Sequence, residues 1–345
     1  MSNRPEITFI LPTRNRVQWI VRAIKSCLDL ECKEFGVRVL VIDGQSTDGG
    51  FEAVQEKLAG DVRVLLRRQT REGRFTAACQ EGVDAVQTEY AALMFDDDIL
   101  LPNYGLLAKK MIHDGSSFGF GFGALGAVAG RLNPSPAKGV WWLEPDQLLQ
   151  AYLGFRGKLG HHGYPQSPLC ALAKAALWKE WSVEIDKFCR ENPLRVRCML
   201  EKSAGPDFLI YLLAASRGDR PIPALNGVVA QFSEHKGTLT AELSGAELPT
   251  GYWLSYRWLL EEVLRQKRPQ WAASVHAYLL KKLRSLHMFW QNQAPDLFAP
   301  ERNSLSLVQA EIPAFYRWQG ILRSRLPRLF RMAEWDSARY EEFPP

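Results

Sequence analysis

Three consecutive carboxylates, Asp96, Asp97 and Asp98, are the strongest chemical signal in this sequence. They follow an apolar run at residues 90–95, so we expect them at the end of a buried strand. Adjacent carboxylates repel one another, and a cation placed among them relieves that repulsion. Oxygen ligands of this kind suit Mg²⁺ or Mn²⁺, which take further ligands from the phosphates of a substrate. The alternative is a solvated acidic turn.

The elements before this cluster alternate between strand and helix. Short apolar runs typical of buried strands are followed by segments with apolar residues at helical spacing. The strands are expected at residues 7–11, 37–42, 62–66 and 90–95, and the helices at 17–30, 51–58 and 75–86. Repeated strand–helix units predict an α/β fold with a mostly parallel sheet flanked by helices. Ligands bind at the carboxyl ends of the strands in such sheets, where the polar residues of this chain fall.

Three segments of the chain resemble glycosyltransferase family 2. They are Ile10-Leu-Pro-Thr-Arg-Asn-Arg16, Val41-Ile-Asp-Gly-Gln-Ser-Thr-Asp-Gly49 and the strand with its aspartates at residues 90–102, in the order and spacing of that family. The resemblance covers residues 7–102. It implies the GT-A fold, a Rossmann-like sheet of the nucleotide-diphospho-sugar transferase superfamily, and the transfer of a sugar from a nucleotide-diphosphate donor, with a UDP-sugar expected.

The same resemblance assigns the nucleotide site. Pro12, Thr13 and Arg14 after the first strand, and Asp43 after the second, would hold the base and ribose. An aspartate that accepts a hydrogen bond from a base N–H favours uracil or thymine. Arg74 stands where some members of the family place an arginine that contacts the base or phosphate, and Arg71 is a nearby substitute.

The metal site follows from the alignment of Phe95-Asp96-Asp97 with the DxD motif of the family. Phe95 then replaces the first aspartate, Asp96 contacts the donor, and Asp97 becomes the expected ligand of Mn²⁺ or Mg²⁺; Asp98 is the ligand if the register shifts by one residue. Many GT-A enzymes also have a histidine after the acceptor region that reaches the metal or diphosphate, which implies His235. A neutral imidazole is a competent ligand, although a lone histidine is also found in cores and on surfaces.

A further segment, residues 205–218, resembles the Gly-Glu-Asp sequence with which the family opens a helix, with Pro206 in place of the glutamate. The resemblance implies that Asp207 is the general base. An inverting transferase needs one carboxylate to take the proton of the acceptor hydroxyl as its oxygen attacks the anomeric carbon. The metal and nearby cations stabilise the departing diphosphate, so no protein nucleophile is required. The alternative is an aspartate favoured only by the helix dipole.

Charge and composition suggest how the rest of the chain is organised. The chain has 345 residues, 46% hydrophobic and 23% charged, as in a folded protein. The net charge of +5 arises wholly within residues 251–345, where Trp and Leu alternate with Arg and Lys in helical patterns. We expect a GT-A catalytic domain at residues 1–245, with a nucleotide-binding half at 1–102 and an acceptor-binding half at 103–245, and a helical region at 246–345.

The basic helical region allows more than one partner. Helices of this composition lie on anionic membrane surfaces, and they also pack against a catalytic domain or a second subunit of a homo-oligomer. Nucleic acid is not an expected partner. The acceptor is expected to be a glycan, a lipid-linked molecule or a protein, and surface polysaccharide biosynthesis is a common task of the family.

Targeting and cysteine patterns complete the expectations. The N-terminus does not resemble a signal peptide, and the six cysteines form neither a CxxC pair nor a Cys/His cluster. We therefore expect a reduced cytoplasmic protein, at most peripheral at the inner face of the membrane. Two other functions remain open: a nucleotidyltransferase, disfavoured because residues 12–17 contain no glycine, and a non-catalytic nucleotide-sugar-binding protein, suggested by the departures at Gly44, Phe95 and Pro206.

Overall fold

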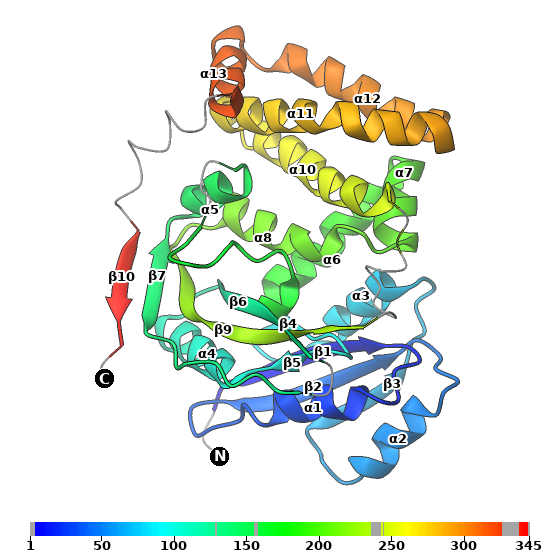
Figure 1. Ribbon diagram of the computed structural model, residues 1–345, viewed down its shortest axis with the longest axis vertical. Helices are drawn as coiled ribbons and strands as arrows, with labels where there is room; N and C mark the ends of the chain where they lie inside the picture. Colours follow the sequence, from blue (N-terminus) through cyan, green and yellow to red (C-terminus); the bar gives the residue numbers. More distant parts are fainter. Residues whose placement is uncertain are drawn as a thin grey trace.

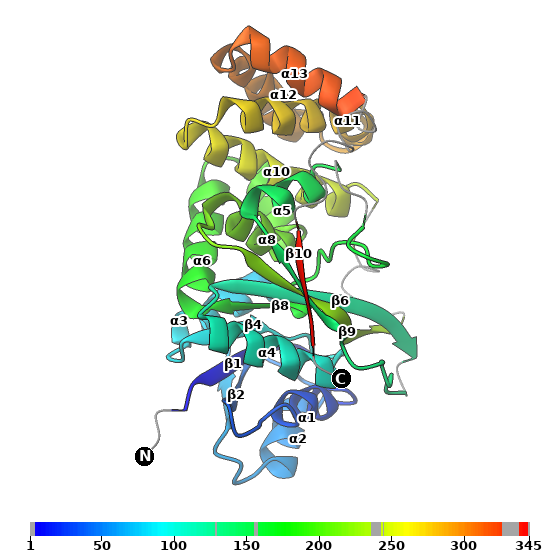
Figure 2. The same cartoon turned by 90° about the vertical axis from the view of Figure 1, so that its left-hand side faces the viewer.

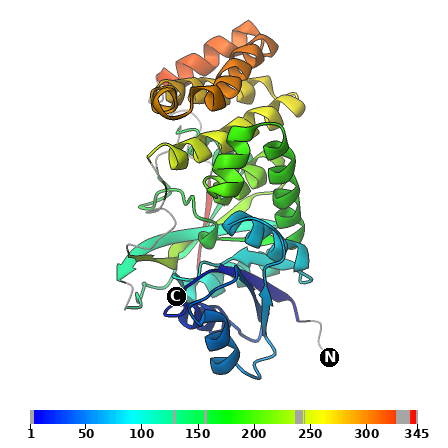
Figure 3. The same cartoon turned by 90° about the vertical axis from the view of Figure 1, so that its right-hand side faces the viewer.

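The computed structural model describes residues 4–127, 130–154, 158–235, 243, 245–325 and 338–343. In this part of the chain, ten strands form one mixed sheet in the order β10-β7-β9-β6-β8-β4-β1-β2-β3, with β5 paired to β9 (Figure 1). The sheet runs through the lower and middle parts of the molecule. The C-terminal helices are stacked above it, as the views in Figures 2 and 3 also show.

The first four strands form the parallel part of the sheet. They are β1 (Glu6–Thr13), β2 (Gly36–Asp43), β3 (Val64–Arg68) and β4 (Tyr90–Leu93), and they alternate with α1 (Ile20–Leu28), α2 (Gly50–Lys57) and α3 (Phe75–Ala85). β1 lies between β2 and β4, and β3 is next to β2, all in parallel. The apolar runs of β1, β2 and β4 are buried in the core, whereas β3 lies at the edge of the sheet, with Leu65 exposed. The strand–helix alternation predicted for residues 7–95 is therefore confirmed.

The middle of the chain extends the sheet and adds helices above it. Its elements are β5 (Ile99–Leu100), α4 (Pro102–Asp114), β6 (Phe118–Ala127), β7 (Gly139–Leu143), α5 (Pro145–Tyr152), η1 (Pro168–Cys170), β8 (Ala171–Lys174), α6 (Ala175–Arg190), α7 (Pro193–Arg195), η2 (Val196–Glu201), α8 (Pro206–Arg217) and β9 (Ile222–Glu234). β9 pairs in parallel with β6 and antiparallel with β5 and β7. A Cβ on Gly123 of β6 would overlap the Phe232 ring, so this glycine permits the close pairing of β6 and β9.

The C-terminal region is mainly helical, as predicted. It contains α10 (Glu247–Arg265), α11 (Pro269–Gln293), α12 (Pro295–Val308), η3 (Gln309–Glu311), α13 (Ala314–Arg325) and β10 (Arg339–Glu342). β10 is a correction to an all-helical expectation: it returns to the sheet and pairs antiparallel with β7 at its edge (Figure 1). Its four residues are too few and too polar for their alternation to indicate a strand.

One hydrophobic core joins the C-terminal helices to the rest. Trp178 and Trp181 of α6 and Phe208 of α8 belong to the same buried cluster as Trp253 and Trp258 of α10. The domain boundaries at residues 102 and 245 remain predictions, and this core extends across the second of them. Among the helices described, none is both long enough and apolar enough to cross a bilayer.

Candidate active site

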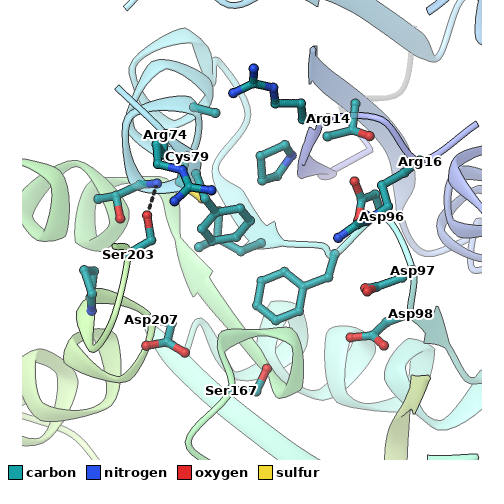
Figure 4. A pocket seen from close by; sticks show the side chains of 18 of the residues that line it. Arg14, Arg16, Arg74, Cys79, Asp96, Asp97, Asp98, Ser167, Ser203 and Asp207 are labelled. Carbon is teal, nitrogen blue, oxygen red and sulfur yellow. Dashed lines mark hydrogen bonds and ion pairs between the residues drawn. The ribbon is translucent and has the colours of Figure 1, made fainter. Parts of the chain in front are cut away.

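A cavity of about 1170 Å³ lies at the carboxyl ends of β1 and β4 and extends to the start of α8. It brings together most of the residues singled out from the sequence. Those that line it are Pro12, Thr13, Arg14, Arg74, Asp96, Asp97, Asp98, Asp207 and His235. Figure 4 shows the three aspartates on one wall and Asp207 on the facing wall. The donor site and the general base expected from the sequence thus share one space.

The three aspartates of the turn after β4 have different surroundings. Asp96 lies 3.7 Å from the Arg16 guanidinium, and burial, with repulsion from Asp97, raises its pKa to about 7. Asp98 is turned inward and accepts a hydrogen bond from the backbone N–H of Ser233 at 2.8 Å. Burial, again with repulsion from Asp97, raises the pKa of Asp98 to about 8. A cation at this turn would remove the repulsion that all three share.

His235 completes this wall from the far end of β9. Its Nε2 lies 2.8 Å from Oδ2 of Asp97. The two residues meet because β5, just after the aspartates, pairs with β9, with Ile99 opposite Gln231. The imidazole also lies against the Trp19 ring, with the ring centroids 4.1 Å apart. The structure therefore holds a carboxylate and an imidazole side by side on rigid elements.

This pair fits a divalent cation that is bound mainly through a substrate. Carboxylate and imidazole are both accepted by Mn²⁺, and Mg²⁺ commonly uses one or two carboxylates with phosphate oxygens and water. Among the residues that the structure describes, no group of three or more His, Cys, Asp or Glu side chains surrounds a common point. A site built on Asp97 and His235 leaves its other positions to a diphosphate and water.

Two of the expected donor residues, Asp43 and Arg71, do not line the cavity. Asp43 is buried beside Gly44, which does line it. Oδ2 of Asp43 accepts from Arg68 at 2.5 Å and from the N–H of Ser46 at 3.0 Å, whereas its buried Oδ1 has no hydrogen-bond partner among the described residues.

Arg71 points away from the site. Its guanidinium donates to Asp186 of α6 at 2.6 Å and lies 3.5 Å from Asp84. The family resemblance offered Arg74 and Arg71 as alternatives, and of these Arg74 lines the cavity. Arg71 instead connects the β3–α3 loop to α6. Figure 4 shows the Arg74 side chain extending into the space between the two walls.

Asp207 lies in the first turn of α8 and lines the cavity on the side opposite the three aspartates (Figure 4). The helix begins after Gly205, whose φ of 96° favours glycine, and Pro206 occupies the first turn, where its missing N–H is not needed. Burial raises the pKa of Asp207 to about 7. A carboxylate with such a pKa exchanges protons near neutral pH, as a general base must.

The turn that carries Asp207 is held by three elements that are distant in sequence. Ser203 accepts from the N–H of Thr76 at the start of α3 at 3.0 Å. The Trp181 indole of α6 donates to the Pro206 carbonyl at 2.7 Å, and Ser255 of α10 donates to the Gly205 carbonyl at 2.9 Å. No sequence pattern indicates these contacts, because each depends on tertiary packing.

Comparison with known proteins identifies the family to which the N-terminal part of the chain belongs. Residues 8–147 match the sequence model of the family described as Glycosyl transferase family 2. This part of the chain is a family 2 glycosyltransferase domain. The predicted family is confirmed, and so is the predicted class of enzyme, a glycosyltransferase. No curated protein matches the chain in a sequence search.

Solved structures of similar fold extend the likeness over most of the chain. Residues 1–349 of S. aureus TarS, crystallised with UDP-GlcNAc, are 17% identical, with a TM-score of 0.59 over 94% of this chain and 87% of that one. The longer TarS structure gives a TM-score of 0.54 at 15% identity, over 94% of this chain and 54% of that one. Glucosyl-3-phosphoglycerate synthase from Mycobacterium tuberculosis, crystallised with Mn²⁺, UDP and glucosyl-3-phosphoglycerate, is 16% identical over 75% of this chain and 81% of that one, with a TM-score of 0.47. The likeness to TarS confirms the predicted GT-A fold.

Proposed function

We propose that this family 2 glycosyltransferase moves a sugar from a UDP-sugar to an acceptor hydroxyl with inversion at the anomeric carbon. The observation that carries the proposal is the single cavity with the Asp97–His235 pair on one wall and Asp207 on the other. It has room for a nucleotide-sugar between a phosphate-binding end and a base. The fold that the chain shares with TarS, which was crystallised with UDP-GlcNAc, supports a UDP-linked donor.

The uridine would lie against the ends of β1 and β2. Pro12, Thr13 and Arg14 line this end of the cavity, and Asp43 lies next to it beside Gly44. The buried Oδ1 of Asp43 is an acceptor that the described residues leave unused, and the N3–H of uracil is a donor that would satisfy it. Arg74 would contact the diphosphate.

Mn²⁺ or Mg²⁺ would be held by Asp97 and His235 together with the donor phosphates. When bound, the ion neutralises charge that develops on the leaving diphosphate. Asp98, the alternative ligand, already accepts from the Ser233 amide, so we assign it to holding the turn. Asp96 faces Arg16, and we place it next to the donor.

The chemistry needs a proton acceptor and a leaving group on opposite sides of the anomeric carbon. The ionised Asp207 takes the proton of the acceptor hydroxyl while that oxygen forms its bond to the anomeric carbon. The bond from that carbon to the diphosphate oxygen breaks, and UDP leaves with the bonding electrons. Attack from the Asp207 wall and departure toward the Asp97 wall gives inversion.

We also propose that the C-terminal helices contact an anionic membrane surface. Phe315, Trp318 and Ile321 lie on one face of α13 and are 64%, 62% and 40% exposed. Residues 313–332 contain five arginines and no acidic residue. Aromatic side chains flanked by arginines are suited to the headgroup region of a bilayer. This placement favours a lipid-linked or surface-glycan acceptor.

Donor turnover tests the proposed function. UDP-linked sugars are screened by thermal shift with Mn²⁺, and each stabilising donor is assayed for release of UDP. We expect Asp207→Asn to bind the donor as the unsubstituted chain does and to release UDP at least a hundredfold more slowly. Normal turnover in that variant would refute the base assignment. Release of pyrophosphate from UTP and a sugar phosphate would instead establish a nucleotidyltransferase.

A further inference from the structure

Helix α10, from the C-terminal region, packs directly on the turn that carries Asp207. Gly251 of α10 faces Ala204 and Gly205 so closely that a Cβ on Gly251 would overlap the Ala204 carbonyl, and one on Gly205 would overlap the Gly251 carbonyl. One turn further along α10, Ser255 donates to the Gly205 carbonyl. This backbone-to-backbone contact fixes α10 relative to the first turn of α8.

The residues of α10 next to this contact reach the cavity. Leu248 and Tyr252, four residues apart and therefore on one helical face, both line it. The Tyr252 ring packs on Phe208, with the centroids 5.8 Å apart. The negative charge of Asp207, ahead of burial, raises the pKa of the Tyr252 phenol. Tyr252 is thus held beside Asp207 by a helix that the catalytic motifs of the family do not include.

We propose that Tyr252 is a positioning residue for Asp207, donating its phenol hydrogen bond to the ionised carboxylate, so that helix α10 completes the catalytic site. This inference rests on the proposed role of Asp207 as the base. The hydrogen bond favours the charged form of Asp207, and it orients the carboxylate toward the acceptor hydroxyl. It also means that the C-terminal region contributes to the reaction as well as to stability.

The backbone N–H of Phe208 donates to Oδ1 of Asp207 at 2.9 Å, and the other side chains around Asp207 do not supply the hydrogen bond proposed for Tyr252. Tyr211, on the same helix, donates its hydroxyl to the Ser167 carbonyl at 2.8 Å. Cys79 of α3 is buried, which raises the pKa of its thiol, and a thiol is a weak donor. Arg74 lines the cavity and is assigned to the diphosphate. Of these groups, the phenol of Tyr252 is therefore best suited to serve Asp207.

The test measures the ionisation of Asp207 without depending on turnover. Urea unfolding of the full chain is followed from pH 4 to pH 9 for the unsubstituted protein and for Tyr252→Phe, each with and without Asp207→Asn. For each of the two proteins, the unfolding free energy is compared with that of its Asp207→Asn counterpart. The dependence of this difference on pH reports the ionisation of Asp207 in the folded state. We expect Tyr252→Phe to move the upper end of this transition upward by about one pH unit, because the variant loses a hydrogen bond that favours the ionised carboxylate.

Tyr256→Phe is the matched control, because Tyr256 is on the same helix and its hydroxyl donates to the Tyr152 carbonyl at 2.7 Å. It should lower stability at every pH and leave the transition in place. A transition unmoved by Tyr252→Phe, or moved equally by Tyr256→Phe, would overturn the inference.

The proposed function is judged separately, by UDP release in Asp207→Asn. If that variant turns over normally while the transition still moves in Tyr252→Phe, Tyr252 positions Asp207 but Asp207 is not the base.

Discussion

His235 Nε2 lies 2.8 Å from Asp97 Oδ2, although 138 residues separate them in sequence. The contact joins the end of β9 to the turn after β4, and both residues face the cavity. A carboxylate and an imidazole in contact in the wall of a cavity can serve together as metal ligands. Metal binding and nucleotide binding should therefore depend on each other here.

We expect Asp97→Ala and His235→Ala each to weaken Mn²⁺-dependent binding of UDP at least tenfold, about 1.4 kcal/mol. Because the two side chains would share one ion, the losses of UDP affinity in the two single variants should not add in the double variant. Isothermal titration calorimetry with Mn²⁺, and again with EDTA, measures this. Asp219→Asn, which removes an exposed carboxylate elsewhere, is the control. Equal UDP affinity with Mn²⁺ and with EDTA in the unsubstituted protein would exclude the metal role.

The sequence allowed the parallel half of the sheet to be predicted because each strand is a short apolar run that ends in a polar residue. Asp96, Asp97 and Asp98 could be placed at a strand end for the same reason. Within the helical region predicted for residues 246–345, the bounds of α12 could not be predicted, since Pro295 and Pro300 interrupt its apolar spacing. The contribution of α10 to the site could not be predicted either, because it depends on tertiary packing between distant segments.

Recognition of uracil by Asp43 makes a prediction about base preference. In Asp43→Asn the donors Arg68 and Ser46 N–H should hold the amide oxygen where Oδ2 now stands. The NH₂ then takes the place of Oδ1 and cannot accept from the uracil N3–H. We expect UDP affinity to fall about tenfold and the preference for UDP over CDP to narrow, since the N3 of cytosine is an acceptor. Competition binding of UDP and CDP in the presence of Mn²⁺ measures both effects. An unchanged ratio of the affinities for UDP and CDP would show that Asp43 does not recognise the base.

The raised pKa of Asp207 predicts how stability and activity vary with pH. Because burial raises the pKa of Asp207 from 3.8 to about 7, the folded state binds more protons than the unfolded state between these values. The stability that Asp207 contributes is therefore full below about pH 4 and is lost as pH rises to about 7, by about 4 kcal/mol. Asp207→Asn should remove this decline in urea unfolding.

Activity should follow the opposite direction, since only the ionised carboxylate accepts a proton. We expect kcat/KM for UDP release to rise tenfold per pH unit below about pH 7 and to level off above it. An acid limb centred near pH 4 would mean that Asp207 is ionised throughout the neutral range, and it would contradict the effect of burial.

The close approach of Gly251 to Ala204 predicts an asymmetry between two glycines inside helices. Gly251→Ala places a methyl group against backbone that cannot move without displacing Asp207, so we expect a loss of about 1–3 kcal/mol in stability together with lower turnover. Gly105→Ala in α4, where a Cβ meets nothing within 4 Å, should stabilise by up to about 1 kcal/mol and leave turnover unchanged. Chemical unfolding and UDP release of both variants test this pairing.

Membrane contact through α13 makes a prediction about vesicle binding. The full-length protein should sediment with vesicles of phosphatidylglycerol and phosphatidylcholine at low salt, less so at high salt, and not with phosphatidylcholine alone. Trp318→Glu should weaken binding at least tenfold, because it removes an exposed aromatic side chain and adds a negative charge beside arginines. Val62→Glu, a change at a residue 86% exposed near the N-terminus of β3, should bind as the unsubstituted protein does. If Trp318→Glu instead converts a dimer to a monomer and leaves vesicle binding unchanged, this face of α13 is an interface between two copies of the chain. That result would mean that a second copy of the chain, and not a lipid surface, covers this face.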